Sequence, residues 1–352
     1  MSVSTVIVDP DGDTLIILPC IEEAVGVEDD QNKPRKVTQN HSEFHFKVSM
    51  KHLQLASRRA KAMFAGGFKE ARPMEVDGLR HWTFEPMFDP DAFSTVMEII
   101  HGKTQHFPQQ VSLEHMAEIA SIVDDLECQG AVWFFAKMWM PPLKHKLSHP
   151  KCDENLARWI LIAYVFHEPE VFKCATLKAI CCSTGPISTF GLPIRPKIIG
   201  PLARIDSIEL ARQDSIDKEV SALYSEVDRL CDDKPRCAPG CRPLLLGSLI
   251  GDMKRAKLFS PRPSRPFDKL ALDTLLMKVR GFQSAKIYST SSKYDRWRYE
   301  QTPYARRPEM IPEPLRDHSC ILDQDVESTC MSIASGIQGL ELASFVNGPI
   351  HH

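Results

Sequence analysis

Cys231, Cys237 and Cys241 come nearest to the spacing of a metal site, in the pattern Cys-x5-Cys-x3-Cys. A structural zinc needs four tetrahedral ligands, usually with at least one close pair such as Cys-x2-Cys. No fourth ligand is singled out by the sequence, which offers Cys174, Cys181, Cys182 and His318. Small buried thiols explain the same cluster without a metal. We therefore expect no bound metal.

Other reactive side chains also have simpler explanations. His167 lies near Glu168 and Glu170 in the sequence. A cation near the C-terminal end of a helix dipole explains this grouping without catalysis. Asp124 and Asp125 are adjacent on a predicted helix and diverge, so they cannot act as a carboxylate pair. The chain has no nucleophile elbow, phosphate loop, dinucleotide fingerprint or His-Glu-x-x-His motif. The sequence thus predicts neither an enzyme nor a cofactor, and an enzyme in the helical half is the alternative it supports least.

The N-terminal part alternates between strand and helix patterns. Residues 14–18 form a run of strand formers, and apolar alternation predicts further strands at 44–48 and 82–84. The polar segment 20–40 between the first two strands is predicted to be a loop. Residues 53–64 are compatible with a helix that Gly66 and Gly67 end. These elements indicate a small α/β domain.

Three helices are predicted to follow. Asp89 and Pro90 begin the first, whose apolar face is Phe93, Val96, Met97 and Ile100, and Ser112 caps the second. Residues 131–140 are apolar nearly all round, so this third helix must be buried on several sides or lie in an interface. Pro141 and Pro142 are predicted to end it.

This order of elements resembles the BTB/POZ family, especially the BTB proteins common in filamentous fungi. The family's strand-to-helix pattern is Phe-x-Val-His-Lys-x-x-Leu, then Ser and a Met-Phe pair, and the matching residues are Phe46, Val48, Leu53, Ser57, Met63 and Phe64. The family's Asp-x-Phe…Tyr-x-Gly helix is similar to residues 91–103, where the matches are Phe93, Val96, Ile99, Ile100 and Gly102. The chain departs from the family at four of these positions, where Ser49 replaces its His, Arg59-Ala60 its aromatic pair and His101 its Tyr, and its hairpin carries a long acidic and basic insertion.

The resemblance implies an α+β fold, with a small sheet flanked by helices and a mainly helical region behind it. It also implies a protein-interaction adaptor, whose partners would be a second copy, a cullin-type ubiquitin-ligase scaffold or a transcription complex. In cullin-binding relatives, the helix resembling residues 91–103 and the next helix carry the contact. The partner-binding residues expected here are Phe93, Met97, His101 and Phe107.

Phe107 and the short segment before Thr14 both bear on how such a domain would bind its partners. Phe107 is a large aromatic in a polar loop, and it is either tucked into its own domain or part of an interface. Some BTB dimers exchange an N-terminal helix and strand, but only about a dozen residues precede Thr14, too few for that whole device at ~1.5 Å per helical residue. Self-association by that route is therefore not expected.

The domain prediction is an interaction domain at 1–142, a helical region at 151–282 and a largely irregular tail at 283–352. Asp153 is predicted to cap one helix of the middle region and Asp268 its last helix. Between them lies a short heptad seam of apolar residues: Ile216, Val220, Leu223, Val227 and Leu230.

Composition bounds the remaining possibilities. The 352 residues carry a formal net charge of −3, which gives no argument for general nucleic-acid or membrane binding. An acidic start and the lack of a long apolar stretch predict a soluble protein of the cytoplasm or nucleus, with its 11 cysteines as free thiols. A nuclear, transcription-associated regulator is the alternative, on the basis of one modest basic patch: Lys254, Arg255, Lys257, Arg262 and Arg265.

Overall fold

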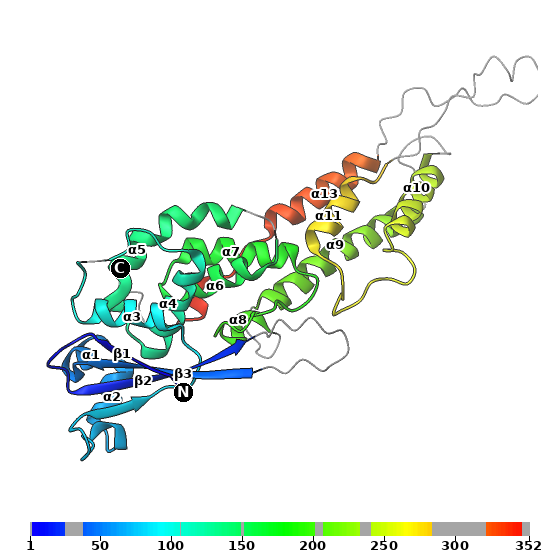
Figure 1. The fold of residues 1–352 in the computed structure, drawn as a ribbon. Helices are drawn as coiled ribbons and strands as arrows, with labels where there is room; N and C mark the ends of the chain where they lie inside the picture. Colours follow the sequence, from blue (N-terminus) through cyan, green and yellow to red (C-terminus); the bar gives the residue numbers. More distant parts are fainter. Residues whose placement is uncertain are drawn as a thin grey trace, which may run out of the picture. The chain divides into compact units, whose positions relative to one another are not determined.

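The computed structural model describes residues 2–24, 38–105, 107–148, 151–200, 207–232, 241–283 and 322–346. The chain divides into two compact units (Figure 1). Unit 1 comprises Met1–Lys178, Ser188–Ile198 and Gly339–His352, and unit 2 comprises Ala179–Ile187 and Ile199–Gln338. Unit 1 contains a small mixed sheet with helices, whereas the described part of unit 2 is mainly helical.

The sheet of unit 1 has four strands in the order β1 (Ser2–Ile7), β3 (Thr38–Val48), β2 (Thr14–Ala24) and β4 (Arg80–Thr83). β2 and β3 pair in antiparallel register with Thr14 opposite Val48, while β1 runs parallel to β3 and β4 parallel to β2. The alternation of residues 44–48 is confirmed, since Phe46 and Val48 are fully buried. β2 and β3 continue to Ala24 and from Thr38, so the loop predicted at 20–40 is too long.

Two neighbouring helices replace the single helix predicted at 53–64. They are α1 (Met50–Ala56) and α2 (Arg58–Ala65), followed by the short η1 (Lys69–Ala71). Ser57 separates them, because its Oγ accepts the Ala60 N–H at 2.9 Å and donates to the Leu126 carbonyl at 2.5 Å. The hydroxyl therefore begins α2 and ties this corner to the helix layer.

The next three helices are α3 (Pro90–Ile100), α4 (Leu113–Leu126) and α5 (Gln129–Leu143). Both predicted caps are confirmed: Asp89 accepts the Ala92 N–H at 2.8 Å, and Ser112 accepts the His115 N–H at 3.0 Å. Seven predicted core residues are all at most 8% exposed: Phe46, Val48, Leu53, Phe64, Phe93, Val96 and Ile100. They form one core, in which the Phe46 and Phe93 rings lie 5.1 Å apart.

Further helices complete unit 1, namely η2 (Lys144–Ser148), α6 (Glu154–Val165), most of α7 (Pro169–Cys182), and α8 (Pro196–Ile199) up to Ile198. Asp153 caps α6 as predicted, accepting the Leu156 N–H at 3.1 Å. Its apolar side chains are buried, and it packs along α4. A turn, η3 (Leu342–Ser344), also belongs to this unit.

Unit 2 is built from α9 (Ile208–Cys231), α10 (Cys241–Arg255), α11 (Leu272–Arg280) and α13 (Leu322–Gly336). All five residues of the predicted heptad seam are buried on α9. Asp268 does not cap α11, whose N-cap is Ala271. Instead, the buried Arg212 holds the preceding loop, pairing with Glu209 at 2.6 Å and donating to the Pro266 and Leu270 carbonyls.

One helix lies in the part of the chain that the sequence predicts to be an irregular tail. α13 falls within 283–352, for which the sequence predicts a largely irregular tail. No helix in the described part of the chain has the length and apolar character needed to cross a bilayer.

Candidate protein-interaction surface

Helix α5 has apolar side chains on two faces, of which only one is covered. Val132, Ala136, Trp139, Met140 and Leu143 point into unit 1 and are buried. On the other side, Trp133, Phe134 and Met138 are 48%, 66% and 41% exposed. Spacings of three and four residues place Lys137 beside both Trp133 and Phe134, and Met138 beside Phe134, on the helix surface. We call Trp133, Phe134, Lys137 and Met138 the α5 face.

Lys137 fixes the centre of the α5 face. Its ammonium lies 5.6 Å from the centroid of the Trp133 ring and pairs with Glu168 in the turn between α6 and α7. A cation held over an indole restricts the rotation of the ring. The Trp133 ring is therefore held partly in place before any partner binds, which lowers the conformational entropy lost on binding.

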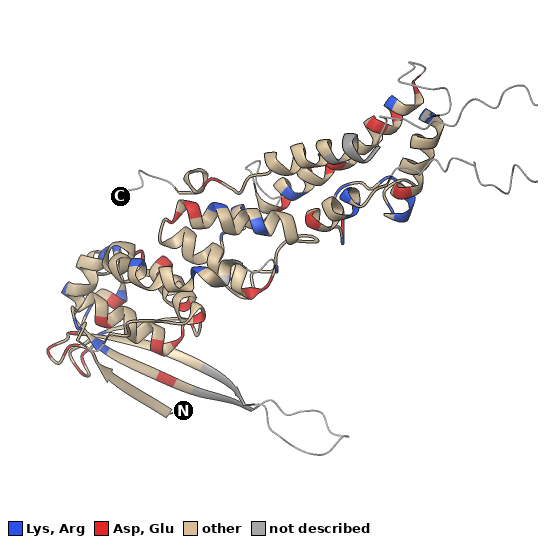
Figure 2. Ribbon diagram, turned by 90° about the horizontal axis from the view of Figure 1, so that it is seen from above, with Lys and Arg blue, Asp and Glu red and all other residues tan. Residues whose placement is uncertain are grey.

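Helix α5, the short helix after it and the loop at 103–110 carry lysines in the sequence, and Glu168 pairs with Lys137 of the α5 face. Residues 103–110 and 129–148 contain four lysines and no acidic residue: Lys103, Lys137, Lys144 and Lys146. Figure 2 marks the charged positions along the ribbon.

Phe107 lies against its own domain. Its ring stacks on Trp139, with centroids 5.5 Å apart and planes at 10°, and it lies 4.5 Å from the Phe135 ring. The Trp139 indole N–H donates to the Pro108 carbonyl at 2.8 Å, so the loop is fastened to α5. This half-buried ring packs on α5, which favours the first of the two explanations for Phe107.

The other predicted partner-binding residues are less accessible. Phe93 and Met97 are 0% exposed and belong to the core, so neither reaches a partner in this structure. The prediction placed the contact on the exposed flank of α3, but these two residues lie on its buried flank. The exposed aromatics of α5 were not named, although the all-round apolar character of residues 131–140 was the signal for them.

His101 is half-buried and serves as a link between helices. Its Nδ1 lies 2.7 Å from the Met97 carbonyl, and its Nε2 lies 3.0 Å from the Ser49 N–H. A neutral ring donating from Nδ1 and accepting at Nε2 satisfies both contacts. Burial lowers the pKa of His101, which agrees with a neutral ring.

A cleft of about 530 Å³ in unit 1 is acidic. It is lined by Pro19, Cys20, Phe44, residues 86–91 and Glu118. Burial, followed by the negative charge of Asp89, raises the pKa of Glu118. Asp89 is already used as the cap of α3. These carboxylates do not form one of the groups of three side chains that could hold a metal ion, none of which occurs among the described residues.

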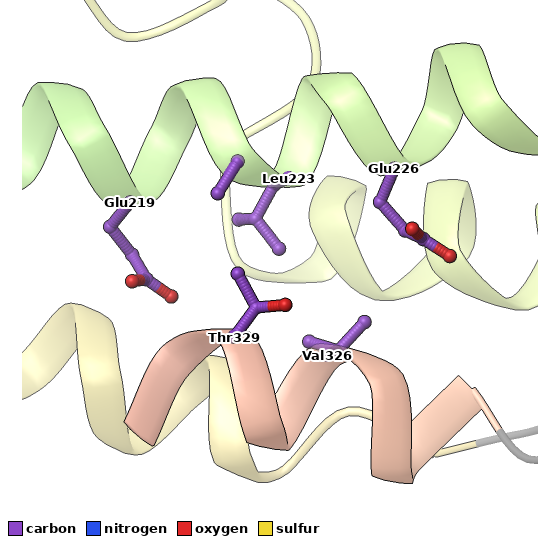
Figure 3. Close-up of a pocket in the computed structure, with 6 residues that line it drawn as sticks. Glu219, Leu223, Glu226, Val326 and Thr329 are labelled. Atoms are coloured by element: carbon purple, nitrogen blue, oxygen red, sulfur yellow. The ribbon is translucent and has the colours of Figure 1, made fainter. Parts of the chain in front are cut away.

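A much smaller cavity of about 30 Å³ lies between α9 and α13 in unit 2 (Figure 3). Figure 3 shows Glu219 and Glu226 of α9 on the side that faces Thr329 and Val326 of α13. The Oε2 atom of Glu219 is buried without a hydrogen-bond partner among the described residues, and burial raises the pKa of its carboxyl. The space is sufficient for water and not for an organic substrate.

The cysteines give no metal centre within the described ranges, where no group of three metal-ligating side chains occurs. Cys231 is an exposed free thiol, while Cys237, the side chain of Cys241 and His318 lie outside the described residues. Cys174 and Cys181 are free thiols. The expectation of free thiols throughout is wrong for Cys152 and Cys182, which are disulfide-bonded.

Several charged residues have structural partners. Arg255 pairs with Asp252, Arg262 lies 4.6 Å from the Tyr224 ring, and Arg265 pairs with Asp214 at 2.5 Å. Three of the five members of the basic patch are therefore engaged within unit 2. Asp124 and Asp125 diverge as predicted, since they pair with Arg195 and Arg59.

Comparison with known proteins assigns no family to the chain. No protein-family model matches the chain, and no curated protein or solved structure is significantly similar to it.

Proposed function

We propose that this chain is a protein-interaction adaptor whose N-terminal unit is BTB/POZ-like and whose partner contacts the α5 face. The observation that carries the proposal is the exposure of Trp133, Phe134 and Met138 on one face of a helix whose other face is core. Exposed, clustered large apolar side chains mark interaction sites, and Trp is enriched among the residues that dominate binding energy.

The order of elements supports the BTB/POZ part of the proposal. After the additional strand β1, unit 1 contains the strand β2, a return to β3, helices, the strand β4 and then further helices. The residues that carry the resemblance occupy its core, with Phe46, Leu53 and Phe93 fully buried. A cullin-type scaffold, a second copy and a transcription complex remain the partner classes to be tested.

The test uses the full chain with Trp133→Ala and Phe134→Ala combined. Titration against a cullin-type scaffold, sedimentation for self-association and quantitative affinity capture from cells test the three partner classes. We expect the affinity for the partner to fall by roughly tenfold or more, because these side chains would be central anchors.

Leu55→Ala is the matched control, because Leu55 is 88% exposed on α1 and is not part of the α5 face. It should leave binding unchanged. If the double variant keeps full affinity for every partner of the wild-type chain, the α5 face is not the binding surface. The melting temperatures of both variants are compared with that of the wild-type chain. If they are equal, a loss of binding does not come from a loss of folding.

A further inference from the structure

Residues 339–345 occupy a site on α7 and α8 in unit 1 in the way that a bound peptide would. Leu340, Leu342 and Phe345 are 6%, 1% and 1% exposed, whereas Glu341, Ala343 and Ser344 point to solvent. The Phe345 ring lies 5.7 Å from the ring of the fully buried Phe172. Three apolar anchors separated by exposed residues are typical of a short linear recognition segment.

Polar contacts fix the register of this segment. The Leu340 N–H donates to the Thr176 hydroxyl at 2.9 Å, and that hydroxyl donates to the Phe172 carbonyl at 2.8 Å. Glu341 pairs with Lys173. The site therefore binds one backbone amide and one carboxylate of the segment in addition to its apolar anchors.

Lys197 of α8 holds the far end of the segment. Its ammonium donates to the Phe345 carbonyl and lies 5.8 Å from the centroid of the Phe345 ring. The two lysines of the site, Lys173 and Lys197, thus face a segment whose one charged residue is Glu341. This charge complementarity favours an acidic ligand.

Gly339 is required where the segment enters the site. A Cβ at this position would lie 2.7 Å from the Lys173 carbonyl carbon, closer than real Cβ contacts occur. The segment therefore has the pattern Gly-Leu-Glu-Leu-x-x-Phe, in which each named residue has a contact or a steric reason.

We propose that the face formed by Phe172, Lys173, Thr176 and Lys197 is a second protein-binding site. Its ligand class is a short segment of the pattern Gly-Leu-(Asp/Glu)-Leu-x-x-aromatic, presented by a partner protein. In the isolated chain the site is held closed by residues 339–345, whose high effective concentration compensates for a small contact. This proposal is independent of the α5 face.

The experiment adds a fluorescent peptide of residues 337–346 to the full-length protein. Gly339→Ala weakens the chain's own segment without altering the site, so this variant should bind the added peptide. We expect binding roughly tenfold or more tighter than to the wild-type chain, whose site is filled. Gly336→Ala is the matched control, since a Cβ at Gly336 meets nothing within 4 Å, and it should behave as wild type.

Two further variants test the identity of the site. A peptide carrying Phe345→Ala should not bind the Gly339→Ala chain, and Thr176→Val added to that chain should abolish binding of the normal peptide. If the Gly339→Ala chain binds the normal peptide no better than wild type does, or binds both peptides equally, the proposal is wrong.

Hydrogen exchange on the wild-type chain covers the case in which Gly339→Ala fails to fold. The Leu340 amide should exchange faster than the amides of α7, because the segment is released while the helix stays folded. Equal protection of the segment and of α7 would show that the segment is a permanent part of the core and would overturn the proposal.

Discussion

Phe107 packs on α5 and Phe134 is a residue of α5, but their side chains are expected to contribute differently to stability. Phe107 packs on Trp139 and Phe135, whereas Phe134 is 66% exposed. Phe107→Ala should lower the free energy of unfolding by about 2 kcal/mol, less than the ~3–5 kcal/mol of a fully buried phenylalanine, because the ring is half-buried. Urea denaturation of the full chain measures this.

The contrast variant is Phe134→Ala, which should change the free energy of unfolding by less than about 0.5 kcal/mol, as surface substitutions do. A large loss of stability with Phe134→Ala would mean that this side chain is part of the core. Unchanged stability with Phe107→Ala would mean that the loop does not support α5.

His101 should make stability depend on pH. Because burial lowers its folded-state pKa below the ordinary 6.5, its contribution is fully present above pH 6.5 and is lost as pH falls through the folded value. Protonation also removes the acceptor for the Ser49 N–H. Thermal unfolding between pH 7.5 and 5 should therefore show a smaller loss for His101→Gln, which does not titrate.

His145→Gln is the control for this titration, because His145 is exposed. It should retain the pH dependence of the wild-type chain. The same slope in the His101→Gln and wild-type proteins would exclude His101 as its source.

Helices α9 and α13 bury the Glu219 carboxyl between them, and this should weaken their pairing at neutral pH. The folded-state pKa of Glu219 is raised above its ordinary 4.5, so stability falls as pH rises from 4.5 through the folded value. Glu219→Gln should raise the free energy of unfolding at pH 7 by about 1 kcal/mol, since it removes a buried charge with an unsatisfied oxygen. Melting curves at pH 4 to 8 measure the effect.

Glu226→Gln provides the matched control one heptad further along α9. Glu226 pairs with Arg229, so its substitution should give no gain at pH 7. The advantage of Glu219→Gln should also vanish below pH 4.5, where the carboxyl is protonated in both states. An advantage that is constant with pH would point to packing and not to charge.

The sequence could predict elements where side-chain chemistry marks them. Asp89, Ser112 and Asp153 each act as the cap that their position before an apolar repeat indicated. β1 was missed because Val3 and Ile7 are 55% and 60% exposed, so no buried face marks this edge strand. α13 was missed because only Val326 and Cys330 of its described side chains are buried.

The binding surface was predicted less well than the core. Periodicity identifies which residues share a helix face, but it does not identify which of two apolar faces is covered. α3 and α5 illustrate this, since Phe93 and Met97 proved to be core while Trp133 and Phe134 stayed exposed. The close approach at Gly339 depends on a contact with Lys173, far away in the sequence, which no local pattern indicates.

At the scale of the whole molecule, residues 1–142 are still predicted to fold alone, because they contain the sheet and the core of α3 and α4. Adding residues 143–182 should raise the melting temperature, since α6 packs along α4 and buries Trp159 and Ile160. Cooperative unfolding of both fragments, at a higher temperature for the longer one, is the expected result.

A substitution within the longer fragment separates packing from length. Ile160→Ala should remove most of the added stability, because deleting a buried isoleucine side chain typically costs ~2–5 kcal/mol. Arg158→Ala, which removes exposed ion pairs with Glu114 and Glu154, should leave most of it. An unstructured 1–142 fragment would place the domain boundary further along the chain.

The position of residues 339–345 in unit 1 has a consequence for folding during synthesis. At about 5–20 residues per second, the ribosome needs roughly 7–28 s to proceed from Ile198 to Gly339. Throughout that interval the nascent unit 1 has Phe172 and Thr176 uncovered, although its sheet and α1–α6 are already complete. During that interval a chaperone or a neighbouring nascent chain can contact this surface without displacing residues 339–345, as it would have to do in the finished protein.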